Sequence, residues 1–241
     1  MNILRRYRLV LLSIALCTVA SPIATPLAAQ ASTKDPTASA LLKATKSVIA
    51  KEASVHVTHV TKTGSATTSI VADVGKHNGT ERITSGSGHV TITVTPDYVY
   101  LSGNSAGLVS IMGLTAADQK KVGSESISMK AGTTPYTDLA SSATISLVDL
   151  VLPAAKGTTV STKNVNNKKF YALKWTISAT STSPKAASVM TITEGKLALP
   201  FNETVTATSG VATTTFSRWG ELIKAVAPPS STVIAYAKVF G

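Results

Sequence analysis

The sequence is poor in cysteine, aromatic residues and acidic residues. Cys17 is the only cysteine among 241 residues, so no disulfide can form within the chain and stability must come from the hydrophobic core. The G-x-S-x-G pattern occurs once, at Gly103-Asn104-Ser105-Ala106-Gly107, and a single match among many serines is weak evidence for a hydrolase built on a serine elbow. The 12 acidic residues are scattered singly, so no paired-carboxylate site is indicated. These absences predict a protein that is not an enzyme and holds no cofactor.

A long apolar run is also missing. Near the N-terminus, Leu9–Ala20 gives an apolar run of 12 residues, shorter than the roughly 20 that a membrane-spanning helix requires. Arg5, Arg6 and Arg8 precede this run, and Ala29-Gln30-Ala31 follows it with small residues at the −3 and −1 positions of a cleavage site. The pattern predicts an export signal over residues 1–31.

Cys17 allows a second interpretation of the same segment. Ile14-Ala15-Leu16-Cys17 partly matches a lipobox, although Leu16 is bulkier than the small residue usual before the acylated cysteine. Residues 1–16 would then be a lipoprotein signal, and residues 17–34, rich in Ala, Ser, Thr and Pro, a flexible tether. Both alternatives place the protein outside the cytoplasm, either secreted or in the cell envelope. Residues 35–241 have the length of one β-rich domain.

The charge balance is basic, with 23 Lys and Arg residues and a net charge of +11. Residues 1–31 carry three arginines and no acidic residue, so their removal leaves +8. The only lysine doublets are Lys120-Lys121 and Lys168-Lys169, and no arginine-rich stripe occurs. This distribution argues against nucleic-acid binding. It fits weak attraction to anionic lipid headgroups or acidic wall polymers, and equally an ordinary solvated surface.

The four histidines do not form a metal site. His56 and His59 are three residues apart, which on a strand places them on opposite faces, and His77 and His89 lie beside predicted turns. We expect ordinary solvated histidines and no metal.

Alternating apolar and polar residues predict an antiparallel sheet with one buried face. An amphipathic helix beginning at Asp35-Pro36 precedes it, with Leu41, Leu42 and Ile49 on its buried face. The alternating segments are Val55–Val57, Ile70–Val74, Val90–Val94, Val99–Leu101, Val160–Asn164 and Lys169–Ile177, followed by a strand ladder from Met190. The predicted turns are Asn78-Gly79, Gly86–Gly88, Pro96-Asp97, Asn166-Asn167, Glu194-Gly195 and Ser209-Gly210.

Two apolar segments between the strands predict helices. One is Asn104–Leu114, followed by Thr115, which can cap a short helix that has Asp118 at its third position. The other is Thr137–Leu152, which ends at Pro153. We expect these helices to lie on or inside a curved sheet.

Four motifs carry a resemblance to a known family. They are the hairpin Val165–Lys174, the strand start Leu199-Pro200, Phe216–Glu221 and Ala227-Pro228-Pro229. With the export signal, they resemble the LolA/LppX-like envelope lipoproteins, including those of the LppX, LprA, LprF and LprG type. The resemblance implies an α+β, mainly β fold: an incomplete, half-open antiparallel β-barrel wrapped around short helices.

The resemblance also implies a function. Members of this family bind lipid or lipidated molecules in an apolar cavity and carry them across the aqueous envelope without covalent chemistry. The expected partners are a lipid, glycolipid or lipoprotein cargo and a membrane surface, and the expected state is a monomer. The candidate cavity residues, each of which also fits plain core packing, are Ile92, Val94, Val99, Leu101, Leu108, Ile111, Met112, Leu147, Leu150, Val151, Leu173 and Trp175. The alternative is a secreted or anchored structural or interaction module, regulatory or adhesive, whose sheet is fully packed.

Overall fold

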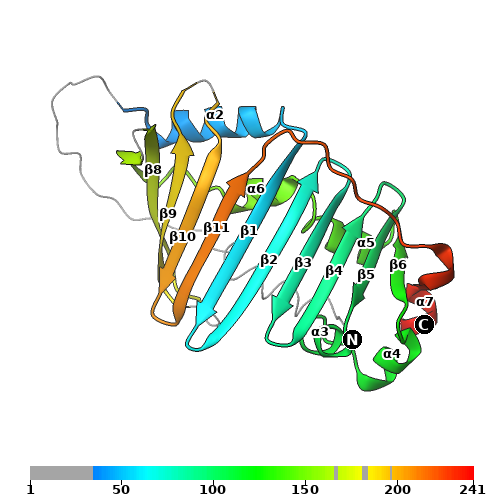
Figure 1. Cartoon of the computed structure of the whole chain (residues 1–241). Helices are drawn as coiled ribbons and strands as arrows, with labels where there is room; N and C mark the ends of the chain where they lie inside the picture. Colours follow the sequence, from blue (N-terminus) through cyan, green and yellow to red (C-terminus); the bar gives the residue numbers. More distant parts are fainter. Residues whose placement is uncertain (1–34, 166–167, 181–183, 196) are drawn as a thin grey trace.

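The computed structural model describes residues 35–165, 168–180, 184–195 and 197–241. These residues form one twisted sheet and several short helices (Figure 1). The strands are β1 (Ser54–Thr63), β2 (Ala66–Gly75), β3 (Gly79–Ser85), β4 (Gly88–Val94), β5 (Tyr98–Gly103), β6 (Ser126–Lys130), β7 (Thr159–Val165), β8 (Lys168–Ile177), β9 (Ala186–Thr193), β10 (Pro200–Ala207), β11 (Gly210–Ser217) and β12 (Val233–Ala235). The helices are α2 (Ala38–Ile49), α3 (Ser105–Ser110), α4 (Ala116–Val122), α5 (Thr134–Ala140), α6 (Ser146–Val151), α7 (Tyr236–Phe240) and the 3-10 turn η1 (Ser230–Thr232).

The strand order is β12-β6-β5-β4-β3-β2-β1-β11-β10-β9-β8-β7. β1 to β6 form one meander and β7 to β11 a second, and β1 pairs with β11 where the two meet. β12 and β7 lie at opposite ends, so the sheet is open, as a half-open barrel requires. The prediction of a mainly β, antiparallel fold is confirmed, with one exception: β12 pairs parallel with β6.

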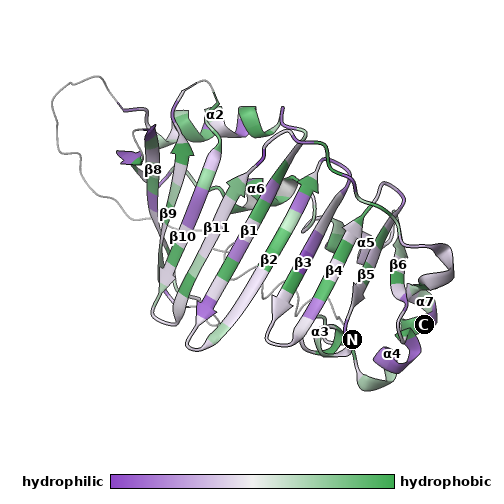
Figure 2. Cartoon of the chain, viewed as in Figure 1, coloured by the Kyte–Doolittle hydropathy of each residue, from purple (hydrophilic) through white to green (hydrophobic). Residues whose placement is uncertain are grey.

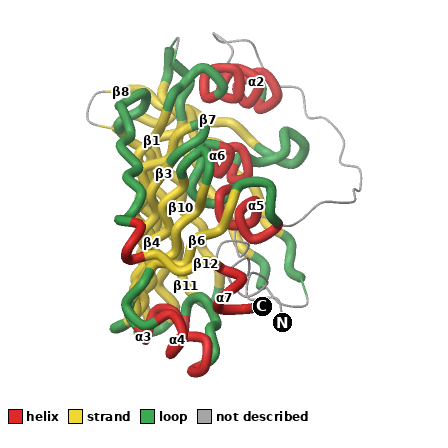
Figure 3. Tube along the Cα trace, turned by 90° about the vertical axis from the view of Figure 1, so that its right-hand side faces the viewer, coloured by secondary structure: helices red, strands yellow, loops and turns green. Residues whose placement is uncertain are grey.

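Helices α2, α5 and α6 lie along the same side of the sheet (Figure 3). We call this side the helix face and the other side the open face. Side chains of directly paired residues point to the same face of a sheet. The alternation is clearest in β4, where Val90, Ile92 and Val94 are buried and the residues between them are half-buried. Figure 2 shows the resulting bands of apolar and polar residues along the strands.

The core is divided into two clusters. The first, here the β4–β5 cluster, consists of side chains from all strands from β2 through β6 and from α3, α4, α5 and α7. The second, here the α2–α6 cluster, joins α2 and α6 to β1, β2, β8, β9 and β11. In the described residues no helix is long and apolar enough to cross a membrane.

The sequence predicted the caps of two helices, α4 and α2, and the structure confirms one of them. Thr115 caps α4 through a capping box with Asp118, which confirms that prediction. The cap of α2 is Thr37 rather than Asp35-Pro36, because the Thr37 hydroxyl accepts the bond from the Ala40 amide. Asp35 instead accepts a hydrogen bond from the Thr162 hydroxyl on β7 at 2.8 Å. The expected buried face of α2 is confirmed, since Leu41, Leu42, Thr45 and Ile49 are all buried.

Turn positions are partly as predicted. The Gly86–Gly88 loop is confirmed, since Ser85 pairs with Gly88. The predicted Ser209-Gly210 turn is displaced by one residue, since Ala207 pairs with Gly210, the first residue of β11, and the turn is Thr208-Ser209. Asn78-Gly79 is not a two-residue turn, because Gly79 is the first residue of β3 and the Gly75 amide donates to the Asn78 carbonyl. Glu194-Gly195 is not a two-residue turn either, since β9 ends at Thr193 and β10 begins at Pro200. Asn166-Asn167 lies outside the described residues.

The predicted helical segment Thr137–Leu152 is divided into α5 and α6. Between them Thr144 forms a bridge with Gly75, and the Ile145 amide donates to the Gly75 carbonyl at 2.9 Å. These backbone contacts with the end of β2 interrupt the helix. They also attach the helices to the sheet.

Gly79 tests this attachment. A Cβ at position 79 would lie 2.0 Å from the Ala143 carbonyl oxygen, so Gly79→Ala forces the 141–145 segment away from β3. We expect a loss of about 1–3 kcal/mol in the free energy of unfolding, measured by urea titration. Ser65→Ala in the exposed β1–β2 turn is the control and should change it by less than about 0.5 kcal/mol. Equal stability of the two variants would contradict this account.

Candidate functional site

The candidate site is the helix face where β1, β11, β10, β9 and β8 lie side by side. Direct pairing places His59, Thr214, Glu203, Met190 and Leu173 in one row across these five strands. All five side chains are buried. The row therefore begins with three polar residues and ends with two apolar ones, in a face that is otherwise mostly apolar.

Apolar side chains adjoin this row on the side of α2 and α6. Val57 on β1 pairs with Phe216 on β11, and both belong to the α2–α6 cluster together with Val148 of α6. Met190 and Leu173 belong to the same cluster, so the row is continuous with it. The arrangement offers apolar contact area next to a small group of polar atoms, which is the usual composition of a site for an amphipathic ligand.

Glu203 is the most unusual residue of the row, because its carboxyl is only 1% exposed. Its Oε1 accepts a hydrogen bond from the Ser188 hydroxyl at 2.8 Å. Its Oε2 is buried and has no hydrogen-bond partner among the described residues. Burial raises the pKa of Glu203 to about 7, and the bond from Ser188 opposes the rise.

His59 is buried as well, at 7% exposed, so the expectation of a solvated histidine is wrong at this position. Its Nδ1 is hydrogen-bonded to the Thr214 hydroxyl and its Nε2 to the Thr61 hydroxyl, each at 2.9 Å. Desolvation by burial lowers its pKa, which favours the neutral imidazole. Both ring nitrogens are engaged within the fold.

A second buried carboxyl, Glu81 on β3, has a structural contact. Its Oε2 accepts a hydrogen bond at 2.9 Å from the hydroxyl of Ser142, in the segment between α5 and α6. This bond attaches the segment to the helix face.

Sequence reasoning missed the burial of Glu81 and Glu203. The signal was available, since each stands two residues before an inward apolar residue, Ile83 or Val205, in an alternating strand.

The predicted cavity residues fall into both clusters. Those in the β4–β5 cluster are Ile92, Val94, Val99, Leu101, Leu108, Ile111 and Met112. Leu173 is buried in the α2–α6 cluster, and Trp175 and Val151 pack against it. Leu147 is half-buried, and the side chain of Leu150 lies outside the described residues.

The cavity within the β4–β5 cluster is small. Its volume is about 20 Å³, and it is bounded by Leu101, Met112, Leu114, Ile127, Met129, Pro135, Leu139, Tyr236 and Phe240. This is room for about one water molecule and not for an acyl chain. Core packing is the simpler role for the predicted residues of this half.

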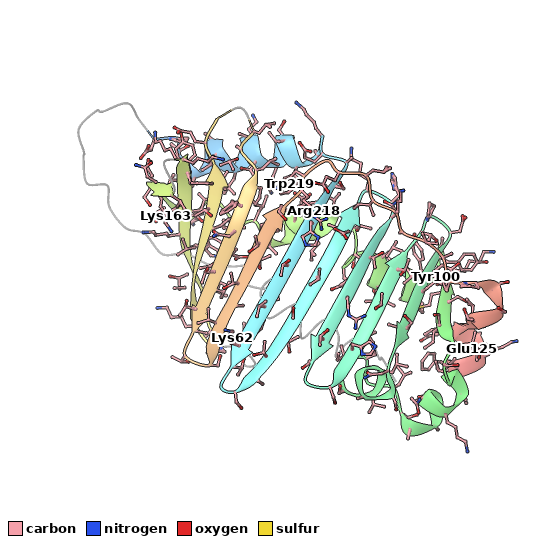
Figure 4. The ribbon with its side chains drawn as sticks, in the orientation of Figure 1. Lys62, Tyr100, Glu125, Lys163, Arg218 and Trp219 are labelled. Atoms are coloured by element: carbon pink, nitrogen blue, oxygen red, sulfur yellow. The ribbon has the colours of Figure 1, made fainter. Side chains whose placement is uncertain are left out.

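A polar cluster lies on the open face at the end of β11, where Figure 4 labels Arg218. His56 Nδ1 lies 2.7 Å from Asp73 Oδ1, and Arg218 Nη2 lies 3.1 Å from the same oxygen and also contacts His56. Glu221 Oε2 is 3.9 Å from Arg218 Nη1. His56 and His59 thus face opposite sides, as predicted.

This cluster holds the chain after β11 but lacks a catalytic arrangement. The Thr58 hydroxyl is 3.4 Å from His56 Nε2, longer than the roughly 2.6–3.2 Å of an activated nucleophile. The adjoining hollow, of about 110 Å³, is bounded partly by residues 221–224 of that chain. In the part of the chain that the structure describes, no group of three or more His, Cys, Asp or Glu residues could hold a metal ion.

The raised pKa of Glu203 makes stability depend on pH. The neutral carboxyl is tolerated below about pH 4.5, and ionisation of the buried group costs stability as pH rises through about 7. Relative to Glu203→Gln, the wild-type protein should lose about 3 kcal/mol of unfolding free energy between pH 4.5 and 8, measured by urea titration. His59 is present in both proteins, so its contribution to the pH dependence of the unfolding free energy cancels when the two are compared. Glu125→Gln, away from the helix face, is the control. If the difference in unfolding free energy between wild type and Glu203→Gln did not change with pH, the raised pKa of Glu203 would be contradicted.

The comparisons with known proteins concern the fold. No protein-family model matches the sequence, and no curated protein matches it. Among solved structures, the chain is similar to the lipoprotein LppX of Mycobacterium tuberculosis, with 16% identity, a TM-score of 0.49, and coverage of 80% of this chain and 100% of that one. It is also similar to LprF of Mycobacterium bovis, with 14% identity, a TM-score of 0.50, and coverage of 80% and 98%. This protein has the LprF-like fold that its sequence motifs predict.

Proposed function

We propose that this exported protein binds the apolar part of a lipid or lipidated molecule on its helix face and carries it across the aqueous envelope without covalent chemistry. The observation that carries the proposal is the helix face itself. It is the apolar side of an open sheet, covered by short helices from separate parts of the chain rather than by a second sheet (Figure 3). Acyl chains buried there would gain about 0.8 kcal/mol per methylene.

Two further observations support the proposal. The fold is shared with LprF, and the similar LppX is named a lipoprotein. The N-terminal sequence carries the predicted export signal, with cleavage after Ala31 or acylation of Cys17 as the two alternatives. An export signal and an apolar face together fit a carrier better than an enzyme.

A second candidate is a non-enzymatic structural or interaction module with a packed sheet. The observation that favours it is the small cavity of about 20 Å³ in the β4–β5 cluster. The two candidates differ in what occupies the α2–α6 half of the helix face. A carrier requires that half to admit lipid.

The carrier proposal is tested by the lipid that accompanies the protein. Native mass spectrometry and solvent extraction of protein purified from its own membranes should detect bound lipid. Met190→Lys places a charge at a 0% exposed position of the helix face and should reduce binding by about tenfold or more. The matched control is Val71→Lys, 41% exposed, which should bind as wild type does.

Circular dichroism checks that both lysine variants remain folded. Absence of lipid from folded wild-type protein would reject the carrier proposal and leave the packed module. Equal lipid binding by the two folded variants would show that lipid does not enter through the α2–α6 half of the helix face.

Anchoring is a separate question that Cys17→Ser answers. If Cys17 is acylated, the substitution should block processing or move the protein from the membrane fraction to the soluble fraction, because a tether without acyl chains has no membrane affinity. Immunoblotting of both fractions measures the change. Unchanged distribution and size would favour cleavage after Ala31.

A further inference from the structure

We infer that Glu203 is the polar contact of the bound lipid, accepting a hydrogen bond from a free hydroxyl of the cargo. The site would then select lipids that carry a hydroxyl beside their acyl chains over the same lipids with that hydroxyl blocked. The inference rests on the proposed lipid binding, and it adds the chemical class of the ligand and the residue that recognises it.

The hydrogen bonds of Glu203 point to a ligand. Oε1 is satisfied by Ser188, while Oε2 has no partner in the described part of the chain although the residue is only 1% exposed. A buried acceptor left without a partner costs about 1–3 kcal/mol. A leucine or methionine at this inward position would avoid that cost and pack equally well. A hydroxyl donated by a ligand would compensate it.

The neighbours of Glu203 do not supply the missing donor. The Thr214 hydroxyl, next to it on β11, is hydrogen-bonded to His59, and the other ring nitrogen of His59 is occupied by Thr61. None of these hydrogen bonds reaches Oε2 of Glu203. Oε2 is therefore the acceptor of the row that remains for a ligand.

The chemistry of the row favours a neutral hydroxyl over an anionic headgroup. Among the described residues no salt bridge involves Glu203, so no cation there would offset a phosphate or carboxylate placed beside it. His59 is buried with its pKa lowered and adds no positive charge. An anion at this position would meet a buried carboxyl in a weakly polar environment, which is unfavourable. A hydroxyl carries no charge and donates one bond.

The position of Glu203 also suits a lipid with its polar group at the edge of its acyl chains. Met190 is its direct partner on β9, and Leu173 lies one strand further, about 10 Å away across two strand spacings. Both belong to the α2–α6 cluster. Acyl chains lying against that cluster would place an adjoining hydroxyl at Glu203.

Two probes that differ in one group test the inference. 1,2-Dioleoylglycerol has one free hydroxyl, and its 3-O-methyl ether has none, with the same acyl chains. Each is presented to the mature protein in uncharged phosphatidylcholine vesicles, and transfer to protein is quantified by native mass spectrometry over a range of lipid concentrations. The wild-type protein should bind the alcohol about tenfold more tightly than the ether.

The variants assign the preference to Glu203. Glu203→Leu should bind the two probes equally and hold the ether at least as tightly as wild type does. Thr204→Ala, on the open face of the same strand, is the matched control and should keep the tenfold preference. Should Glu203→Leu fail to fold by circular dichroism, Ser188→Ala takes its place, since loss of the hydroxyl that holds the carboxyl should reduce the preference at least threefold.

The outcomes separate the two proposals. Equal binding of alcohol and ether by wild type overturns the role of Glu203 and leaves lipid carriage intact. A preference that survives in folded Glu203→Leu also overturns it. Binding of neither probe, together with no lipid in protein from its own membranes, rejects lipid carriage and this inference with it.

Discussion

The pairing of β1 with β11 is the interaction on which the rest of the structure depends. It joins the end strands of the two meanders through seven paired positions, from His56–Ser217, 161 residues apart in sequence, to Lys62–Val211, 149 residues apart. A slip of one residue would turn Val57 and His59 to the open face. The hydrophobic alternation of both strands prevents this, because it buries Val57 against Phe216 only in the observed register. The helix face is therefore continuous across the junction.

The helices then cover this face by specific close contacts rather than by a continuous second layer. Gly79 allows the Ala143 carbonyl to approach β3, and Glu81 accepts the Ser142 hydroxyl. α2 is held chiefly by buried side chains such as Leu41, Leu42 and Ile49. The segment before α6 is thus fixed by backbone and polar contacts, while α2 rests on apolar packing. Apolar packing is non-directional, which is the property that the proposed lipid binding requires of this half of the helix face.

The sequence predicted what is local and missed what depends on distant partners. Alternation identified β1, β2, β4 and β5, and the Thr115–Asp118 spacing identified the cap of α4. β12 has only three residues and exists because it pairs with β6, so no local pattern indicates it. The division of α5 from α6 likewise depends on Gly75, some 70 residues earlier in the chain. The alternation of β10 places Glu203 on the same face as Val205, but a glutamate normally indicates a solvated position, so its burial was not predicted.

Glu81 and Glu203 show how the same residue type acquires different roles from its neighbours. Both carboxyls lie on inward positions of the helix face and are at most 1% exposed. Glu81 contacts Ser142, a residue of a segment that must be held in place, so its burial has a structural reason. Among the described residues, the side-chain hydrogen bond of Glu203 is with Ser188, on the adjacent strand, which the backbone ladder already fixes. A costly buried carboxyl that contributes no new attachment is better explained by a ligand than by stability. This difference in partners is the reason that the proposed ligand contact is assigned to Glu203 and not to Glu81.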